Sequence, residues 1–206
     1  MIKAVFFDYD GVLTTDRSGS LTTYRYLSRA TGIAFSTINT AFSRYGNDLL
    51  LGKVSYAEIW HEACEALGVD LDIGLLHEAF ESTPVNSGMF SLARRLKVSH
   101  AVGIITDNKK DRMDCLKRCQ ALESLFNPIV VSAEVGASKE SPEIFLYALK
   151  RAGVAPDESI FIDNNKANLL APSALGLSTV FHDDDKNDIG ALIQKLKTLG
   201  AHVGDS

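Results

Sequence analysis

Apolar residues follow two patterns that alternate over residues 85–206, and the first of them also occurs at residues 3–7. Short runs that are apolar at nearly every position alternate with segments whose apolar residues recur every three or four positions. The first pattern is typical of strands buried on both faces, and the second is typical of helices. The patterns predict strands at residues 3–7, 101–105, 129–132, 159–162 and 178–181, with helices at 89–97, 109–120, 142–152, 166–175 and 188–199. We therefore expect an α/β fold, with a parallel sheet covered by helices on both faces.

Residues 16–84 lack such runs and show helical periodicity alone. They predict helices at residues 21–31, 36–51, 55–67 and 71–82, the first three of which are followed by Gly32, Gly52 and Gly68. Glycine is the commonest residue just beyond a helix end. Ser55 and Glu58 have the spacing of a capping box at the start of the third helix. We expect residues 16–84 to form an inserted helical cap domain, and residues 1–15 and 85–206 to form the α/β core.

Composition and charge exclude several classes of protein. The 206 residues carry a net charge of −5, which argues against a general nucleic-acid binder. No apolar segment is long enough to span a bilayer, and the N-terminus lacks the flanks of a signal peptide, so we expect no membrane partner and a cytoplasmic location. The three cysteines include no CxxC pair, which favours free thiols in a reducing compartment. The oligomeric state is not indicated.

Polar residues suited to catalysis lie where predicted strands end. The first strand runs into Asp8 and Asp10, whose two-residue spacing lets both carboxylates face one side of an extended chain. Gly11 then permits a sharp turn. The later strands are followed by Thr106-Asp107-Asn108, Lys139 and Asp163-Asn164. Because ligands of open α/β sheets bind beyond the carboxyl ends of the strands, we expect these residues to form one site.

Three carboxylates at one sheet edge require positive charge nearby. The negative charges of Asp8, Asp10 and Asp163 would be balanced by a divalent cation together with Lys139. A site made only of oxygen ligands favours Mg²⁺. This combination predicts phosphoryl transfer, in which Asp8 attacks phosphorus to form an aspartyl-phosphate. Asp10 would protonate the leaving oxygen and later activate a water, while Lys139 and Thr106 hold the phosphoryl oxygens.

The chain resembles the haloacid dehalogenase-like (HAD) hydrolase superfamily in the order and spacing of four motifs. These are Asp8-Tyr9-Asp10-Gly11-Val12-Leu13-Thr14, Thr106-Asp107-Asn108, Lys139 and Asp163-Asn164. The resemblance covers the whole chain, since the helical insertion is similar to the cap of phosphoglycolate phosphatase-like and epoxide-hydrolase-type phosphatase domains. It implies a Rossmann-like core with a mobile lid.

The resemblance also implies roles for individual residues. Asp8 would be the nucleophile, and Asp10 the acid/base that also offers its backbone carbonyl to Mg²⁺. The implied metal-binding residues are Asp8, Asp10 and Asp163. The implied phosphate-binding residues are Thr106, Asp107, Asn108 and Lys139.

Two positions depart from the usual family pattern. Asn164 stands where many members have a second acid, and Glu140 stands where many have proline after the lysine. Asn164 can still bind a metal-bound water, so we expect altered metal binding and not its loss. Glu140 would either point to solvent or pair with Lys139 and lower activity.

The leading hypothesis is a Mg²⁺-dependent phosphatase for a small phosphorylated metabolite. Two alternatives stay open at this point. One is a phosphomutase, in which the aspartyl-phosphate passes its phosphoryl group to a sugar. The other is a weakly active protein that binds a phosphorylated ligand, which Asn164 and Glu140 would favour.

Overall fold

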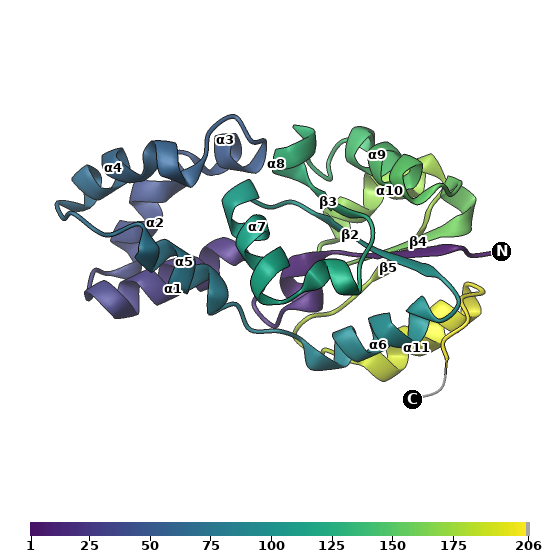
Figure 1. Cartoon of the computed structure of the whole chain (residues 1–206). Coiled ribbons are helices and arrows are strands. Elements are labelled where there is room, and N and C mark those ends of the chain that lie inside the picture. Colours follow the sequence, from purple (N-terminus) through teal and green to yellow (C-terminus); the bar gives the residue numbers. More distant parts are fainter. Residues whose placement is uncertain (205–206) are drawn as a thin grey trace.

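A five-stranded parallel sheet forms the centre of the computed structural model, which describes residues 1–204. The strands are β1 (Ala4–Phe7), β2 (Ala101–Thr106), β3 (Ile129–Val131), β4 (Ser159–Asp163) and β5 (Ser178–Phe181). Their order across the sheet is β3-β2-β1-β4-β5, with every neighbouring pair parallel (Figure 1). The predicted α/β fold is therefore confirmed.

Helices cover both faces of this sheet. On one face, α6 (Ser87–Lys97), α7 (Lys110–Cys119) and α11 (Ile189–Thr198) contribute to a hydrophobic core shared with β1 and β2. On the other face, α9 (Pro142–Ala152) and α10 (Leu170–Leu175) enclose a second core around Phe6 and Phe161 (Figure 1). Shorter elements connect them, namely α8 (Ser132–Val135) and the 3-10 turns Leu122–Ser124, Pro156–Glu158 and Lys166–Leu169. The alternating apolar runs thus mark strands buried from both sides.

Five helices gather beyond the carboxyl edge of the sheet, to the left in Figure 1. They are α1 (Gly19–Thr31), α2 (Phe35–Ser43), α3 (Gly46–Leu50), α4 (Tyr56–Leu67) and α5 (Gly74–Glu81), called here the helical insertion (residues 16–84). They enclose a hydrophobic cluster of their own, centred on Phe42, Tyr56 and Trp60. The capping box of Ser55 and Glu58 is present at the start of α4. Division of the chain into two domains at these boundaries stays a prediction.

The two segments that join the insertion to the sheet run side by side. Thr14 and Val85 form an isolated antiparallel bridge. The Asn86 backbone N–H donates to the Leu13 carbonyl over 2.8 Å, and the Thr15 N–H donates to the Pro84 carbonyl over 3.2 Å. The chain therefore leaves and re-enters the α/β part at a single place.

Two predicted helices differ from the structure. Residues 36–51 form two helices, because the chain turns at Tyr45, whose N–H bonds to the Phe42 carbonyl, and Gly46 follows. Residues 166–175 begin as a 3-10 turn and become α-helical only at Leu170. Pro172 explains this, since proline fits the first turn of an α-helix but not its interior. In residues 1–204 no helix has the length and apolar character needed to cross a membrane.

Candidate active site

The carboxyl ends of β1, β2 and β4 lie in register, so the residues that follow them meet. Phe7 pairs with Ile104 on one side and with Ile162 on the other. The next residues of β1 and β4 are therefore neighbours, and the Asp8 N–H donates to the Ile162 carbonyl over 2.9 Å. Asp8 is 5% exposed and Asp163 is fully buried. The predicted convergence of Asp8 and Asp163 is present in the fold.

Asp10 lies in the turn Tyr9–Leu13 shortly after β1, where its backbone is extended, with a ψ of 129°. Gly11 makes this turn possible, because its φ of 76° is in the left-handed region. A Cβ atom at Gly11 would also lie 2.1 Å from the side-chain nitrogen of Asn164. A side chain at position 11 would therefore require the Asn164 side chain to move, in addition to the strain of a positive φ.

Lys139 lies between the first and third carboxylates. Its Nζ is 2.8 Å from Asp8 Oδ1 and 2.7 Å from Asp163 Oδ2, and the residue is 2% exposed. Burial opposes the lysine charge, but the two carboxylates outweigh it and raise the pKa of Lys139. The Asp107 Oδ1 accepts the Lys139 backbone N–H over 2.9 Å and so fixes the loop that carries the lysine.

The carboxylate of Asp8 is in an unfavourable environment. Burial raises the pKa of Asp8 to about 8, Lys139 lowers it in part, and Asp163 adds to the rise. One lysine faces two carboxylates, so this cluster keeps a net negative charge when both are ionised. Among residues 1–204 no hydrogen bond is donated to Asp8 Oδ2, while Oδ1 lies 2.8 Å from Lys139 Nζ.

Asp10 is held by Arg112, a residue that the sequence analysis missed. Arg112 Nη2 donates to Asp10 Oδ1 over 2.9 Å, and Nη1 donates to Oδ2 over 2.8 Å. Asn108 Nδ2 adds a third bond to Oδ2 over 2.9 Å. Arg112 is 1% exposed and also reaches Thr83 Oγ1, at 3.3 Å, in the segment that returns from the insertion. Arg112 lies in the first turn of α7, four residues after Asn108, and this spacing was the available signal.

Asn168 is a second residue that the sequence analysis missed. Its Nδ2 lies 3.1 Å from Asp163 Oδ2 and 3.3 Å from Oδ1. The Asn165 backbone N–H adds a bond of 2.7 Å to Asp163 Oδ1. Together with Lys139 these donors fix the orientation of the Asp163 carboxylate.

The predicted phosphate-binding residues have different surroundings. Thr106 is buried at the end of β2, and its Oγ1 lies 3.5 Å from Asn108 Nδ2. The Asn108 N–H donates to Ser132 Oγ over 3.0 Å, and its amide group is bound to Asp10 and Arg112. The Asp107 carboxylate is directed at the Lys139 backbone. Phosphate binding by these residues stays a prediction.

The predicted metal-binding residues offer oxygen atoms as ligands. Asp8 and Asp163 are buried oxygen donors on either side of Lys139, and their excess negative charge suits a hard divalent cation. Within residues 1–204 no group of three or more His, Cys, Asp or Glu side chains is arranged to hold a metal. The predicted Mg²⁺ site uses only the side chains of Asp8 and Asp163, together with the backbone carbonyl of Asp10. The Asp10 carboxylate is not needed there, since it is bound to Arg112. The residues present therefore fit Mg²⁺.

The residues at the strand ends belong to a sequence that matches a known protein family. A family model described as haloacid dehalogenase-like hydrolase matches residues 2–176. The chain belongs to the haloacid dehalogenase-like hydrolase family. The resemblance inferred from the four motifs is thereby confirmed.

Known relatives of this HAD-like chain are distant in sequence. It is 23% identical over 205 residues to bifunctional epoxide hydrolase 2 of Rattus norvegicus, with 89% of this chain and 37% of that protein covered. The chain thus spans little more than a third of that relative. It is 23% identical over 193 residues to D-ribitol-5-phosphate phosphatase of Bacteroides thetaiotaomicron, with 87% and 91% covered.

A solved structure supports the same assignment of the fold. The magnesium complex of a HAD family enzyme from Bacteroides thetaiotaomicron aligns with a TM-score of 0.76 at 23% identity. The alignment covers 94% of this chain and 98% of that chain, so it includes the helical insertion. This chain is therefore a HAD-like hydrolase with an insertion between its first and second motifs.

The two departures from the family pattern have distinct surroundings. Asn164 packs against Gly11 in the loop that carries Asp10. Glu140 is exposed, and the ion pairs of Lys139 are with Asp8 and Asp163. The structure thus agrees with the first reading of Glu140, a side chain pointing to solvent.

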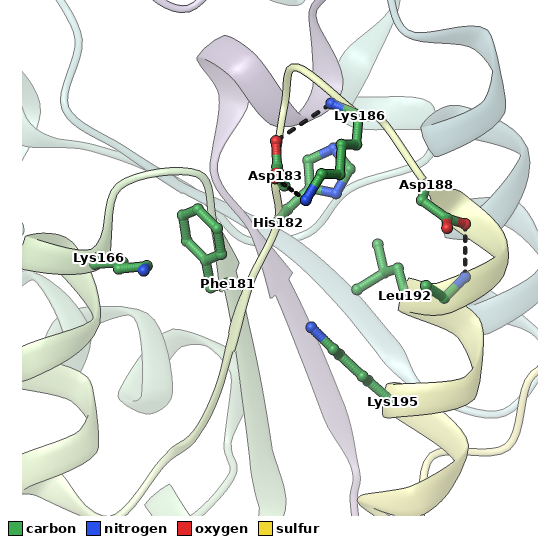
Figure 2. A pocket seen from close by; sticks show the side chains of 9 residues that line it. Lys166, Phe181, His182, Asp183, Lys186, Asp188, Leu192 and Lys195 are labelled. Carbon is green, nitrogen blue, oxygen red and sulfur yellow. Dashed lines mark hydrogen bonds and ion pairs between the residues drawn. The ribbon is translucent and has the colours of Figure 1, made fainter.

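A cavity of about 430 Å³ lies beside this site, between the end of β5 and α11 (Figure 2). Leu192 and Lys195 of α11 face the residues that follow β5, and Asp183 pairs with Lys186. The cavity lining contains none of the predicted catalytic residues. It is a neighbour of the HAD-like site and not part of it.

Proposed function

We propose that this chain is a Mg²⁺-dependent phosphatase that hydrolyses a small phosphorylated metabolite through an aspartyl-phosphate. One observation carries the proposal. Asp8 is buried at the end of the central strand with one oxygen on Lys139 and the other without a protein partner in the described chain. A carboxylate oriented by a lysine, with a free oxygen, suits nucleophilic attack on phosphorus.

The first step would transfer the phosphoryl group to the protein. Asp8 Oδ2 attacks phosphorus, the ester P–O bond breaks, and the leaving oxygen takes a proton from Asp10. Both Asp10 oxygens contact Arg112 in this structure, so one of them has to exchange that contact for the substrate oxygen. Lys139 and Thr106 stabilise the phosphoryl oxygens.

The second step would regenerate the enzyme. Asp10 removes a proton from a water molecule, which attacks phosphorus and releases phosphate from Asp8. Asp8, Asp163 and the Asp10 carbonyl would hold Mg²⁺, which neutralises charge on the phosphoryl oxygens when bound. Asn168 and Lys139 keep Asp163 in the orientation that such binding needs.

The helical insertion would act as the cap over this site. Asp10 is 8% exposed, and α7, which carries Arg112, packs directly against α5. Such enclosure favours phosphoryl transfer, because bulk water is excluded from the reaction. The name of one relative, D-ribitol-5-phosphate phosphatase, is consistent with a phosphorylated polyol as substrate.

The test is phosphate release from a panel of small phosphate esters, with Mg²⁺ and with EDTA. We expect Mg²⁺-dependent turnover by the wild type and none by Asp8→Asn. The exposed carboxylate of Asp157 provides a matched control, and Asp157→Asn should retain full turnover. Turnover by a correctly folded Asp8→Asn variant would refute the mechanism.

One observation favours a second candidate, a phospho-ligand binding protein of low activity. Both oxygens of the acid/base Asp10 are already bound by Arg112 and Asn108. The ester panel separates the two candidates, since binding of an ester without phosphate release would support the second. Isomer formation from a sugar phosphate would instead indicate a phosphomutase.

A further inference from the structure

Lys109 lies at the boundary between the helical insertion and the sheet. It follows Asn108, whose amide bonds to Asp10, and it directly precedes α7. Its Nζ donates to Ser20 Oγ of α1 over 2.9 Å. The side chain also lines a crevice of about 180 Å³ between the start of α7 and the α3–α4 turn. Lys109 is therefore close to the candidate active site but outside its set of predicted residues.

The ammonium group of Lys109 has no negative partner. No carboxylate in residues 1–204 lies within ion-pair distance of its Nζ, whereas Lys139 and Arg112, the other enclosed cations near the site, each contact a carboxylate. Burial, assisted by the nearby Arg112 guanidinium, lowers the pKa of Lys109 to about 8, and the more distant charges of Asp10 and Asp107 oppose this shift only in part. A partly buried cation that contacts no anion is unfavourable, so the position suits a negative charge that comes from a ligand.

The other charged residues of the crevice are already paired. Lys53 pairs with Asp48 at 3.3 Å, and Lys110 pairs with Asp114. The two carboxylates that line the crevice are bound at the start of α4. Glu58 accepts the Ser55 N–H over 2.6 Å, and Asp111 accepts the Tyr56 N–H over 2.6 Å. Lys109 is thus the crevice cation that stays available to a ligand.

We propose that Lys109, with Ser20, binds a second negatively charged group of the substrate. The substrate class is then a small phosphate ester that also carries a carboxylate or a second phosphate. This inference deepens the proposed phosphatase function and rests on it. Gly19, next to Ser20, lies against the Arg112 guanidinium that binds Asp10, since a Cβ atom at Gly19 would be 2.2 Å from Arg112 Nη1. The Lys109–Ser20 pair is thus near the proposed acid/base, so the second charge would lie close to the reacting phosphorus.

The test compares esters that differ only in the second group. The pair 3-phosphoglycerate and glycerol 3-phosphate exchanges a carboxylate for a hydroxymethyl group. The pair 1,3-propanediol bisphosphate and 3-hydroxypropyl phosphate exchanges a phosphate for a hydroxyl group. We expect kcat/KM to favour the anionic member of at least one pair by about tenfold or more, the usual effect of a charge-assisted hydrogen bond. The pair that shows the preference identifies the second group.

Lys109→Met should remove this preference, and Lys109→Arg should retain part of it. Lys53→Met and Lys110→Met are matched controls, because both lysines border the same crevice but have carboxylates of their own. If Lys109 only fastened α1 through Ser20, its loss would lower kcat/KM for both members of a pair equally. The ratio within each pair, and not the absolute rate, is therefore the readout.

Binding to Asp8→Asn, measured by calorimetry with the same esters, separates this inference from the proposed function. A binding preference without hydrolysis by the wild type would uphold the Lys109 site and refute the phosphatase. Hydrolysis with no preference in either pair would uphold the phosphatase and refute the Lys109 site. A preference that persists in Lys109→Met would also refute the site.

Discussion

Arg112 changes the charge balance that the sequence suggested for the site. From the sequence, the negative charges of three carboxylates were expected to equal the positive charges of Lys139 and one divalent cation. Arg112 adds a positive charge in direct contact with Asp10, so a metal-loaded site would be net positive and would attract a phosphate dianion. Without a divalent cation the same residues are net negative when Asp8, Asp10 and Asp163 are all ionised. Phosphate affinity should therefore depend strongly on the metal.

Loss of the Arg112 contact should destabilise the protein. Arg112→Gln leaves the Asp10 carboxylate buried and unpaired, which costs about 3 kcal/mol in unfolding free energy. Urea denaturation measures this cost, and exposed Arg118 on the same helix gives the control Arg118→Gln, with an effect below about 0.5 kcal/mol. Adding Asp10→Asn should recover part of the loss. Strict additivity of the two substitutions would show that the pair is not coupled.

The raised pKa of Asp8 predicts a pH-dependent stability in the absence of metal. Its pKa is about 8 in the folded chain, against an ordinary value of 3.8. The folded chain thus holds a proton that the unfolded chain has released, and stability should fall as the pH rises through this window. Denaturation in EDTA at pH 5 and pH 8 measures the fall, which Asp8→Asn should reduce. Mg²⁺ should stabilise the wild type more at pH 8 than at pH 5.

At the level of elements, the sequence predicted every strand to within one residue at either end. It succeeded because strands buried on both faces leave uninterrupted apolar runs. It missed α8, whose four residues are too short to show helical periodicity. Arg112 was missed for a related reason, since a charged residue on a helix resembles a solvated one until tertiary contacts bury it.

The turn between α3 and α4 packs closely against α8 in the α/β part of the chain. Gly52 has a φ of 67°, and a Cβ atom there would lie 2.0 Å from the Ala133 carbonyl oxygen. Nearby, Ser132 Oγ donates to the Leu50 carbonyl over 2.8 Å. The α3–α4 turn thus packs against α8, and the contact leaves no space for a side chain at position 52.

Gly52→Ala should displace this turn, whereas Gly68→Ala is its matched control. Gly68 has a φ of 69° but open space around its Cβ position, so it shares only the backbone strain of about 1–2 kcal/mol. We expect Gly52→Ala to cost at least 1 kcal/mol more in thermal or urea unfolding and to lower kcat/KM. Equal effects of the two substitutions would show that the turn adapts without loss.

At the scale of the whole molecule, the helical insertion lies against the candidate site, because Ser20 bonds to Lys109 and Thr83 bonds to Arg112. Asp8 and Lys139 are 5% and 2% exposed. If the insertion is the proposed cap, a substrate would reach them only when it moves away from the sheet, and the closed site would hold a small ester but not a phosphorylated residue of a folded protein. The proposed cap would therefore restrict the class of substrate.

This restriction predicts a size limit that phosphate-release assays can measure. Small phosphate esters should be hydrolysed, while a phosphoserine in a folded protein should lose phosphate at least about a hundredfold more slowly, because bound substrate has to fit beneath the closed insertion. Free phosphoserine serves as the control with the same leaving group. Comparable rates for the free and the protein-bound phosphoserine would contradict the enclosed arrangement.

The bridge between Thr14 and Val85 allows residues 16–84 to change in evolution without a change in the Asp8 loop. Because residues 16–84 begin and end at one hydrogen-bonded point, a short turn there could replace them without breaking β1 or α6. Insertion, loss or exchange of this continuous piece of coding sequence would leave the Asp8 loop intact. The insertion's share of the proposed substrate binding, such as Ser20, could thus change separately from the Asp8 loop, because only two adjacent segments of backbone join the two parts.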